Sequence, residues 1–143
     1  MCKRGSDWKM ELVRGRKISG GRAEGLALVS HEPISFFGGV NPDSGIVTEK
    51  GHELEGTSVK DRVLVFPRGK GSTVGSYTMY RMKRNGVAPA AIVNVECEPI
   101  VAVGAIISDI PALDRLEKNP LTLFQTGKRL KVDADRSLVE VSD

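Results

Sequence analysis

The sequence predicts a layered α+β or α/β fold with a partly barrel-like sheet. Short β-type runs come first, two helical segments then alternate with further β-type runs, and a hairpin closes the chain, an order typical of helices layered on a sheet. The 16 glycines and the aromatic content of only 5% favour many short elements joined by tight turns. With 143 residues the chain can bury a core without disulfides or a metal, so we expect a leader over residues 1–9 and a single domain over residues 10–143.

The first half of the chain predicts strands separated by one irregular loop. We expect a half-exposed strand over residues 10–18 and a second strand over 23–29. Residues 30–43 contain Gly-Gly, Asn-Pro and His-Glu-Pro steps that break regular structure. The two adjacent phenylalanines of this loop either plug one end of the sheet or belong to a binding surface. A short strand is expected over residues 45–48.

The second half predicts strands alternating with helices. The apolar run within residues 61–66 predicts a strand buried on both faces. A helix is expected over 72–84, where Asn85-Gly86 is a natural left-handed stop, and a strand over 90–95. The remaining elements are a buried helix over 100–107 with proline in its first turn, a short strand over 110–113, a connection over 116–124 and a hairpin formed by 127–132 and 137–141.

Charge and cysteine content argue against several function classes. The formal charge of +3 is a small imbalance, and Lys128, Arg129 and Lys131 lie on an alternating strand pattern that is typical of a solvated face rather than a nucleic-acid site. Cys2 and Cys97 form no CxxC pair, so no common zinc or iron–sulfur ligand set is present, and Cys97 is interpreted as a core residue. The sequence contains neither a membrane-length apolar run nor a signal region, which predicts a soluble, cytoplasmic protein.

The most informative motif is Pro-Arg-Gly-Lys-Gly-Ser-Thr at residues 67–73, between the buried strand and the helix. Its glycines permit unusual backbone conformations and let another molecule approach the backbone closely. A helix N-terminus offers unpaired N–H groups and partial positive charge. An anion, or a hydroxyl that must become one, would be stabilised there. The alternative is a tight turn in which Ser72 only caps the helix. Spacing alone favours neither interpretation.

Several familiar chemistries do not fit this motif. A Walker-type loop needs lysine directly before serine or threonine, whereas Gly71 separates Lys70 from Ser72. A serine hydrolase needs a histidine base, but His31 and His52 have no spacing that ties them to Ser72, and each is interpreted as a surface residue. A phosphohistidine carrier would need a histidine where Ser72 stands. What remains is a serine hydroxyl that could act as a general base if a second component completed the site.

Residues 20–113 resemble the aconitase X family small subunit, a swivelling domain of the aconitase superfamily. Residues 69–73 are similar to the Gly-x-Gly-Ser-Ser sequence that carries the catalytic serine in that superfamily. The other matching segments are 21–25, 35–42, 45–47, 86–93 and 99–107 with Ile110-Pro111. The resemblance implies an aconitase-like swivelling β/β/α domain.

The same resemblance implies a hydro-lyase subunit. This chain would bind no cofactor or metal itself, while a large subunit would carry a [4Fe–4S] cluster and most substrate contacts. The implied activity is dehydration of (R)-5-phosphomevalonate to trans-anhydromevalonate 5-phosphate in an archaeal-type mevalonate route to isoprenoids. The alternatives are a cis-3-hydroxyproline dehydratase subunit and a non-catalytic binding or regulatory module. Nucleic-acid and membrane partners are not expected.

The resemblance assigns the family's functional roles to the matching positions of this sequence. Ser72 would be the catalytic base that removes the proton next to the substrate carboxylate. Val74 stands where aconitase carries an arginine that meets a substrate carboxylate, which argues against a tricarboxylate substrate. The residues assigned to substrate binding are Gly71, Thr73, Lys70, Ser35, Gly38 and Gly39.

Overall fold

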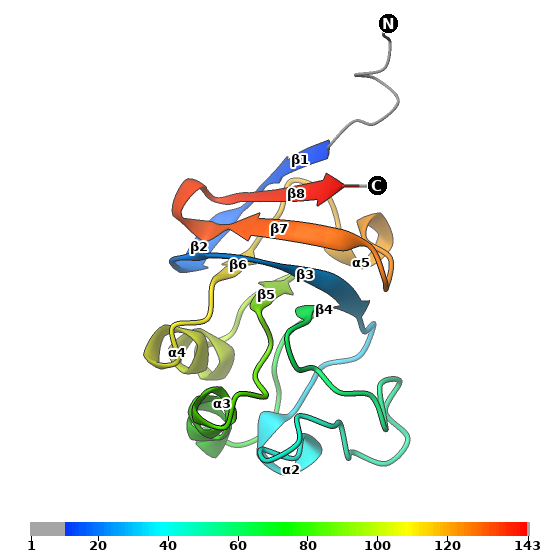
Figure 1. The fold of residues 1–143 in the computed structure, drawn as a ribbon, viewed down its shortest axis with the longest axis vertical. Coiled ribbons are helices and arrows are strands. Elements are labelled where there is room, and N and C mark those ends of the chain that lie inside the picture. Colours follow the sequence, from blue (N-terminus) through cyan, green and yellow to red (C-terminus); the bar gives the residue numbers. More distant parts are fainter. Residues whose placement is uncertain (1–10, 143) are drawn as a thin grey trace, which may run out of the picture.

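A computed structural model describes residues 11–142, and its centre is a mixed eight-stranded sheet (Figure 1). The strand order is β1-β8-β7-β3-β4-β5-β6-β2. The strands are β1 (Glu11–Arg14), β2 (Arg16–Ser19), β3 (Arg22–Val29), β4 (Val63–Phe66), β5 (Ala91–Asn94), β6 (Ala112–Asp114), β7 (Arg129–Asp133) and β8 (Leu138–Ser142). The helices are α2 (Phe36–Gly39), α3 (Val74–Arg84), α4 (Pro99–Ile107) and α5 (Pro120–Leu123), with a 3₁₀ turn, η1 (Ala134–Arg136). The leader expected over residues 1–9 lies outside the described residues.

The two halves of the sheet differ in strand direction. Strands β3, β4, β5 and β6 are parallel neighbours, whereas the remaining pairs are antiparallel. Helices α2, α3 and α4 lie together on one side of the parallel half (Figure 1), and α5 packs on the other side, in contact with β4. Parallel strands end at the same edge of a sheet, so the loops that follow β3, β4 and β5 meet there. The layered fold expected from the sequence is confirmed.

The sheet is curled but not closed. Consecutive strands β1 and β2 lie at opposite edges, separated in sequence only by Gly15, and they are not paired with each other. The single strand expected over residues 10–18 is therefore wrong within the described part. At Gly15 a Cβ would overlap the Leu116 side chain and lie 2.9 Å from the Asp114 carbonyl oxygen. Only glycine allows the chain to pass so close to the end of β6 as it crosses between edges.

The core has one apolar layer on each face of β4. Leu64 and Phe66 pack with the helices, and Val63 and Val65 pack with β7, β8 and the segment around α5. All four side chains are buried, as the apolar run predicts. The strand expected over residues 45–48 is reduced to isolated bridges outside the sheet. Burial of α4 is confined to one face, because Val103, Ile106 and Ile107 are exposed.

A buried carboxylate joins β2 to β6. Asp114 has no exposed surface and accepts hydrogen bonds from Arg16 Nε and Nη2, both at 2.8 Å. Its Oδ2 also accepts from the Cys97 backbone N–H at 2.7 Å. The hydrogen bond to Asp114 raises the pKa of the Arg16 guanidinium, although its burial opposes the change. The carboxylate thus ties an edge strand to the turn that follows β5.

We predict that Asp114→Asn lowers the free energy of unfolding by about 2 kcal/mol, since one amide oxygen cannot satisfy the donors of both Arg16 and Cys97. Denaturant unfolding of the variant measures this change. Glu96→Gln is the matched control, because Glu96 also binds an arginine in two places but is exposed to water. Equal losses in the two variants would contradict the prediction.

Candidate functional site

The glycine loop at residues 67–73 is held from both sides at the carboxyl edge of the parallel strands. On one side the Pro67 carbonyl accepts hydrogen bonds from the backbone N–H groups of Val95 and Glu96, at 3.1 and 3.2 Å. On the other side Ile34 pairs with the loop, donating to the Arg68 carbonyl at 3.2 Å and accepting from the Lys70 N–H at 3.0 Å. The turn after β5 and the loop after β3 therefore fix the backbone of this motif.

Gly69 and Gly71 are required at this loop for different reasons. A Cβ on Gly69 would overlap the Glu98 carboxylate and lie 2.5 Å from Val101 Cγ2, so this glycine lets the loop pack on the start of α4. Gly71 has φ +93°, in the left-handed region, and a Cβ there would lie 2.6 Å from Ser35 Oγ. The Ser35 hydroxyl is itself fixed by donating to the Phe37 carbonyl at 3.0 Å. The first half of the motif is thus shaped by its neighbours.

The N-terminus of α3 is open. Ser72 Oγ accepts a hydrogen bond from the Val74 N–H at 3.1 Å, and the Ser72 side chain is exposed. The backbone N–H groups of Gly71, Ser72 and Thr73 form no hydrogen bond with another residue in the range 11–142. These amides and the positive end of the helix dipole make the position suitable for an anion. Thr73 holds the N-cap position without a side-chain cap, and Ser72 binds only the first N–H of α3, which leaves these amides available.

The N-terminus of α4 is filled by the protein itself. Glu98 accepts hydrogen bonds from the N–H groups of Ile100 and Val101, at 2.8 and 2.9 Å. A carboxylate already satisfies the donors at this helix start. Of these two neighbouring helix starts, only that of α3 has amides available for a ligand.

Five of the predicted site residues line one open pocket of about 360 Å³ beside the glycine loop. They come from the loop after β3, from α2 and from the glycine loop, and they are Ser35, Gly38, Gly39, Lys70 and Gly71. Ser72 and Thr73 do not line the pocket, but they follow Gly71 directly at the open start of α3. The structure therefore brings the predicted residues to one region of the surface.

Two residues that were not assigned from the sequence also line this pocket, Phe37 and Glu49. The Glu49 carboxylate lies 2.9 Å from Lys70 Nζ, so the lysine is paired with a carboxylate. Phe37 is 54% exposed, whereas its neighbour Phe36 is buried and makes an edge contact with Phe66. Each of the two interpretations of the phenylalanine pair thus holds for one residue: Phe36 packs into the core, and Phe37 lines the pocket.

Comparison with known proteins gives consistent matches over nearly the whole chain. The family model described as the aconitase X swivel domain matches residues 12–141. The chain belongs to the aconitase X swivel-domain family. The phosphomevalonate dehydratase small subunit of Methanocella arvoryzae is 57% identical over 130 residues, which cover 91% of this chain and 98% of that protein. The protein of the same name from Thermococcus sibiricus is 50% identical over 131 residues, 92% of this chain and 98% of that protein.

A solved structure supports the same membership. The crystal structure of Thermococcus kodakaraensis aconitase X in its holo-form matches with a TM-score of 0.88 and 50% sequence identity. The match covers 93% of this chain and 99% of that chain. The expected resemblance to an aconitase-type swivelling domain is therefore confirmed.

Neither histidine of this aconitase X swivel domain is placed as a base for Ser72. His31 is exposed and its Nδ1 lies 3.2 Å from Glu53 Oε2. Burial raises the pKa of Glu53, but hydrogen bonds from His31 outweigh it, so the net pKa is lowered. The interpretation of His52 as a surface residue is wrong, because His52 is buried. Its Nδ1 accepts from the Leu54 N–H at 3.0 Å, which leaves Nε2 to donate to the Pro33 carbonyl at 3.0 Å.

The described residues offer no ligand set for a metal cluster. Within residues 11–142, no group of three or more His, Cys, Asp or Glu side chains is arranged to hold a metal ion. Cys97 packs partly against the core beside the helices, and burial, with help from the Asp114 charge, raises the pKa of its thiol to about 12. The helices of residues 11–142 are also too short or too polar to cross a membrane.

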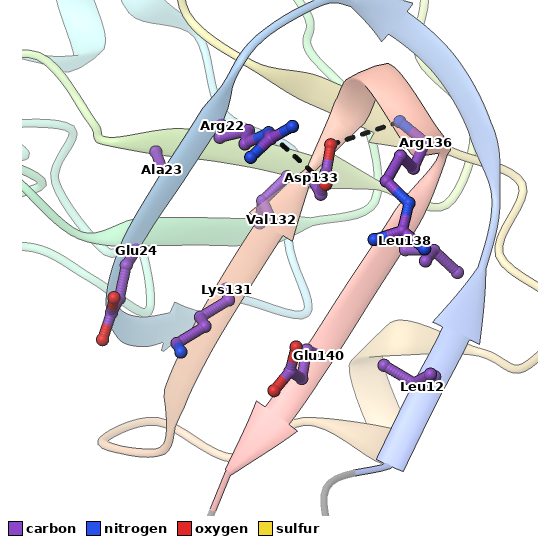
Figure 2. A pocket seen from close by; sticks show the side chains of 10 residues that line it. All are labelled: Leu12, Arg22, Ala23, Glu24, Lys131, Val132, Asp133, Arg136, Leu138 and Glu140. Atoms are coloured by element: carbon purple, nitrogen blue, oxygen red, sulfur yellow. Dashed lines mark hydrogen bonds and ion pairs between the residues drawn. The ribbon is translucent and has the colours of Figure 1, made fainter.

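A larger pocket of about 460 Å³ lies on the outer face of β1, β8, β7 and β3, and none of the predicted site residues lines it (Figure 2). Glu24, Lys131 and Glu140 are register partners in one row across β3, β7 and β8. Arg22 pairs with Asp133 in the same pocket, at 3.5 Å. Opposite charges on neighbouring strands stabilise a solvated sheet face. This arrangement agrees with the interpretation of the basic residues near position 130 as a solvated face.

We predict that Gly71→Ala lowers the free energy of unfolding by about 1 to 3 kcal/mol, because alanine both strains the left-handed backbone and meets Ser35 Oγ. Gly86→Ala is the matched control, since Gly86 has φ +75° but open space around its Cα. Denaturant unfolding should show the larger loss for Gly71→Ala, and amide chemical shifts should change at residues 33–37 only in that variant. The same loss in both variants, with unchanged shifts, would exclude the contact with Ser35 as a constraint.

Proposed function

We propose that this chain is the small subunit of a cytoplasmic dehydratase, a hydro-lyase that converts (R)-5-phosphomevalonate to trans-anhydromevalonate 5-phosphate. The proposal is supported by relatives that are 50 to 57% identical and named phosphomevalonate dehydratase small subunit. The name small subunit implies a large-subunit partner. The observation that carries the proposed role is Ser72 at the open start of α3, beside the glycine-loop pocket.

In this proposal Ser72 first loses its hydroxyl proton to solvent. The resulting alkoxide then takes the proton next to the substrate carboxylate and becomes a hydroxyl again, while the substrate hydroxyl departs. The free amides of Gly71 and Thr73 would stabilise negative charge on the serine oxygen or on the substrate carboxylate. Ser72 is exposed in this chain, so the large subunit would have to cover it to exclude water from the reacting groups. The base is thus supplied by this chain and its environment is completed by the partner.

We assign the [4Fe–4S] cluster to the large subunit, because the described residues of this chain offer no ligand set for it. When bound, the cluster would act as a Lewis acid on the departing hydroxyl. The role of the small subunit is to hold the proton acceptor and one end of the substrate.

The pocket beside the glycine loop is proposed to receive the phosphate end of the substrate. Lys70 supplies a cation at its rim, and Gly38, Gly39 and Gly71 contribute backbone without side chains, so that a ligand can approach closely. Ser35 lines the pocket next to Gly71, and its hydroxyl would turn from the Phe37 carbonyl to donate to a phosphate oxygen. These are the residues to which the sequence assigns substrate binding.

We predict that Ser72→Ala lowers kcat of the reconstituted two-subunit enzyme by at least about a hundredfold, as expected for the loss of a general base. Ser44→Ala is the matched control, because Ser44 Oγ accepts a hydrogen bond from the N–H two residues ahead, as Ser72 Oγ does. Size-exclusion chromatography establishes that both variants still assemble with the large subunit. Full activity of assembled Ser72→Ala would reduce Ser72 to a cap and favour a binding module.

We also predict that the reconstituted pair dehydrates (R)-5-phosphomevalonate and not cis-3-hydroxyproline. The physical reason is Lys70, a pocket cation suited to binding the phosphate group that hydroxyproline lacks. Product formation from each substrate, followed by NMR with the same enzyme preparation, measures the preference. Turnover of hydroxyproline alone would overturn the substrate assignment while leaving the dehydratase assignment in place.

A further inference from the structure

Glu49 forms an ion pair with Lys70, the cation of the proposed phosphate pocket. Its carboxylate oxygen lies 2.9 Å from Lys70 Nζ, and the two side chains are about one third and one half exposed, at 31 and 46%. Both residues line the glycine-loop pocket, and both also line a second, smaller pocket. The ion pair is therefore shared by the two hollows, and a ligand that reaches Lys70 from the glycine loop also meets Glu49, which is paired with it.

The backbone holds each partner in place. The N–H groups of Thr48 and Glu49 both donate to the Gly39 carbonyl, at 2.8 and 3.3 Å, and the Glu49 carbonyl accepts from His52. Lys70 is fixed by its N–H bond to the Ile34 carbonyl. Only the two side chains remain to rearrange when a ligand arrives, and a partly exposed ion pair of this kind is weak enough to exchange partners.

An incoming anion must replace Glu49 at Lys70, and the outcome depends on its charge. A carboxylate would exchange one monoanion for another and gain little from the lysine. A phosphate monoester carries nearly two negative charges and three acceptor oxygens near pH 7, so it forms stronger charge-assisted hydrogen bonds than the carboxylate that it displaces. Lys70 thus binds a phosphate more strongly than a simple carboxylate, and the displacement of Glu49 weakens the binding of both.

We propose that Glu49 is an internal counter-ion of Lys70 that sets the affinity of the pocket for anions and that the phosphate end of the substrate displaces. This inference rests on the proposed function, because it concerns the phosphate end of the same substrate. Glu49 weakens the binding of every anion at Lys70, and its charge also repels the bound phosphate.

The test compares Glu49→Gln, Lys70→Ala and the double variant in the reconstituted two-subunit enzyme. Glu49→Gln should lower both KM for (R)-5-phosphomevalonate and the inhibition constant of inorganic phosphate by about two- to fivefold, the range of an exposed ion pair. Acetate should gain no more than phosphate as an inhibitor of Glu49→Gln, because displacing Glu49 costs the same for both anions and its charge repels the phosphate more strongly. Lys70→Ala should raise KM by about tenfold or more. In the Lys70→Ala background, Glu49→Gln should change none of these constants, because the cation that it controls is absent.

Glu11→Gln is the matched control, because Glu11 forms an ion pair with Lys118 at the same distance of 2.9 Å, and neither residue lines the pocket. The inference is overturned if Glu49→Gln leaves the phosphate and acetate constants unchanged, if Glu11→Gln changes them equally, or if the effect persists without Lys70. If the wild-type pair does not turn over phosphomevalonate, the proposed function fails. Calorimetric titration of the two-subunit complex with inorganic phosphate then still decides the role of Glu49.

Discussion

The candidate site depends on the backbone pairing between Ile34 and the glycine loop. Ser30 still donates to Val65, which continues the parallel pairing of β3 and β4, and the two hydrogen bonds of Ile34 to Arg68 and Lys70 extend it beyond the strand ends. Without this pairing, the loop after β3 and the loop after β4 would be independent segments. With it, the pocket residues of both loops share one rigid backbone, which is the condition for placing a proton acceptor accurately.

Contacts between the helices also fix the backbone of the candidate site. Small residues bring α3 and α4 into close contact, since a Cβ on Gly104 would lie 3.0 Å from Met79 Sδ and one on Gly75 would lie 3.3 Å from Ile100 Cγ2. Ser76 adds a hydrogen bond of 2.6 Å to the Ile100 carbonyl. The start of α3 is therefore fixed relative to α4, whose own start supports Gly69. The glycine loop rests on both neighbours of β4, so its geometry is a property of the whole parallel half.

Local patterns predicted the elements near the site well. Burial of Val63–Phe66 follows from an uninterrupted apolar run, and the stop of α3 at Asn85 follows from Asn-Gly. Hydrophobicity predicts a stripe on α3 through Val74, Tyr77, Met79 and Met82, and only its second half is correct, because Met79 and Met82 are buried while Val74 and Tyr77 face outward. Close packing of small residues such as Gly75 against α4 shifts the buried face away from the start of that stripe.

The tertiary partners could not be predicted in this way. Gly15 divides the first β-type segment between opposite sheet edges because of contacts with Leu116 and Asp114, about a hundred residues away. His52 is buried because two backbone groups satisfy its ring, and a polar sequence gives no sign of that arrangement. Glu49 lies in an irregular polar connection, and its contact with Lys70 arises because Gly39 holds the Glu49 backbone while Ile34 holds the Lys70 backbone.

The two helix starts explain why a glycine-rich motif alone was ambiguous. Both α3 and α4 begin beside Gly69, and both expose backbone donors to the same edge of the sheet. At α4 the protein supplies its own anion, Glu98, and thereby fixes the loop; at α3 the cap uses only the Val74 N–H. A helix start that is already neutralised is a structural support, and one that keeps free amides beside a hydroxyl can accept charge. The difference lies in one glutamate: Glu98 satisfies the first amides of α4, whereas the first turn of α3 contains no acidic residue.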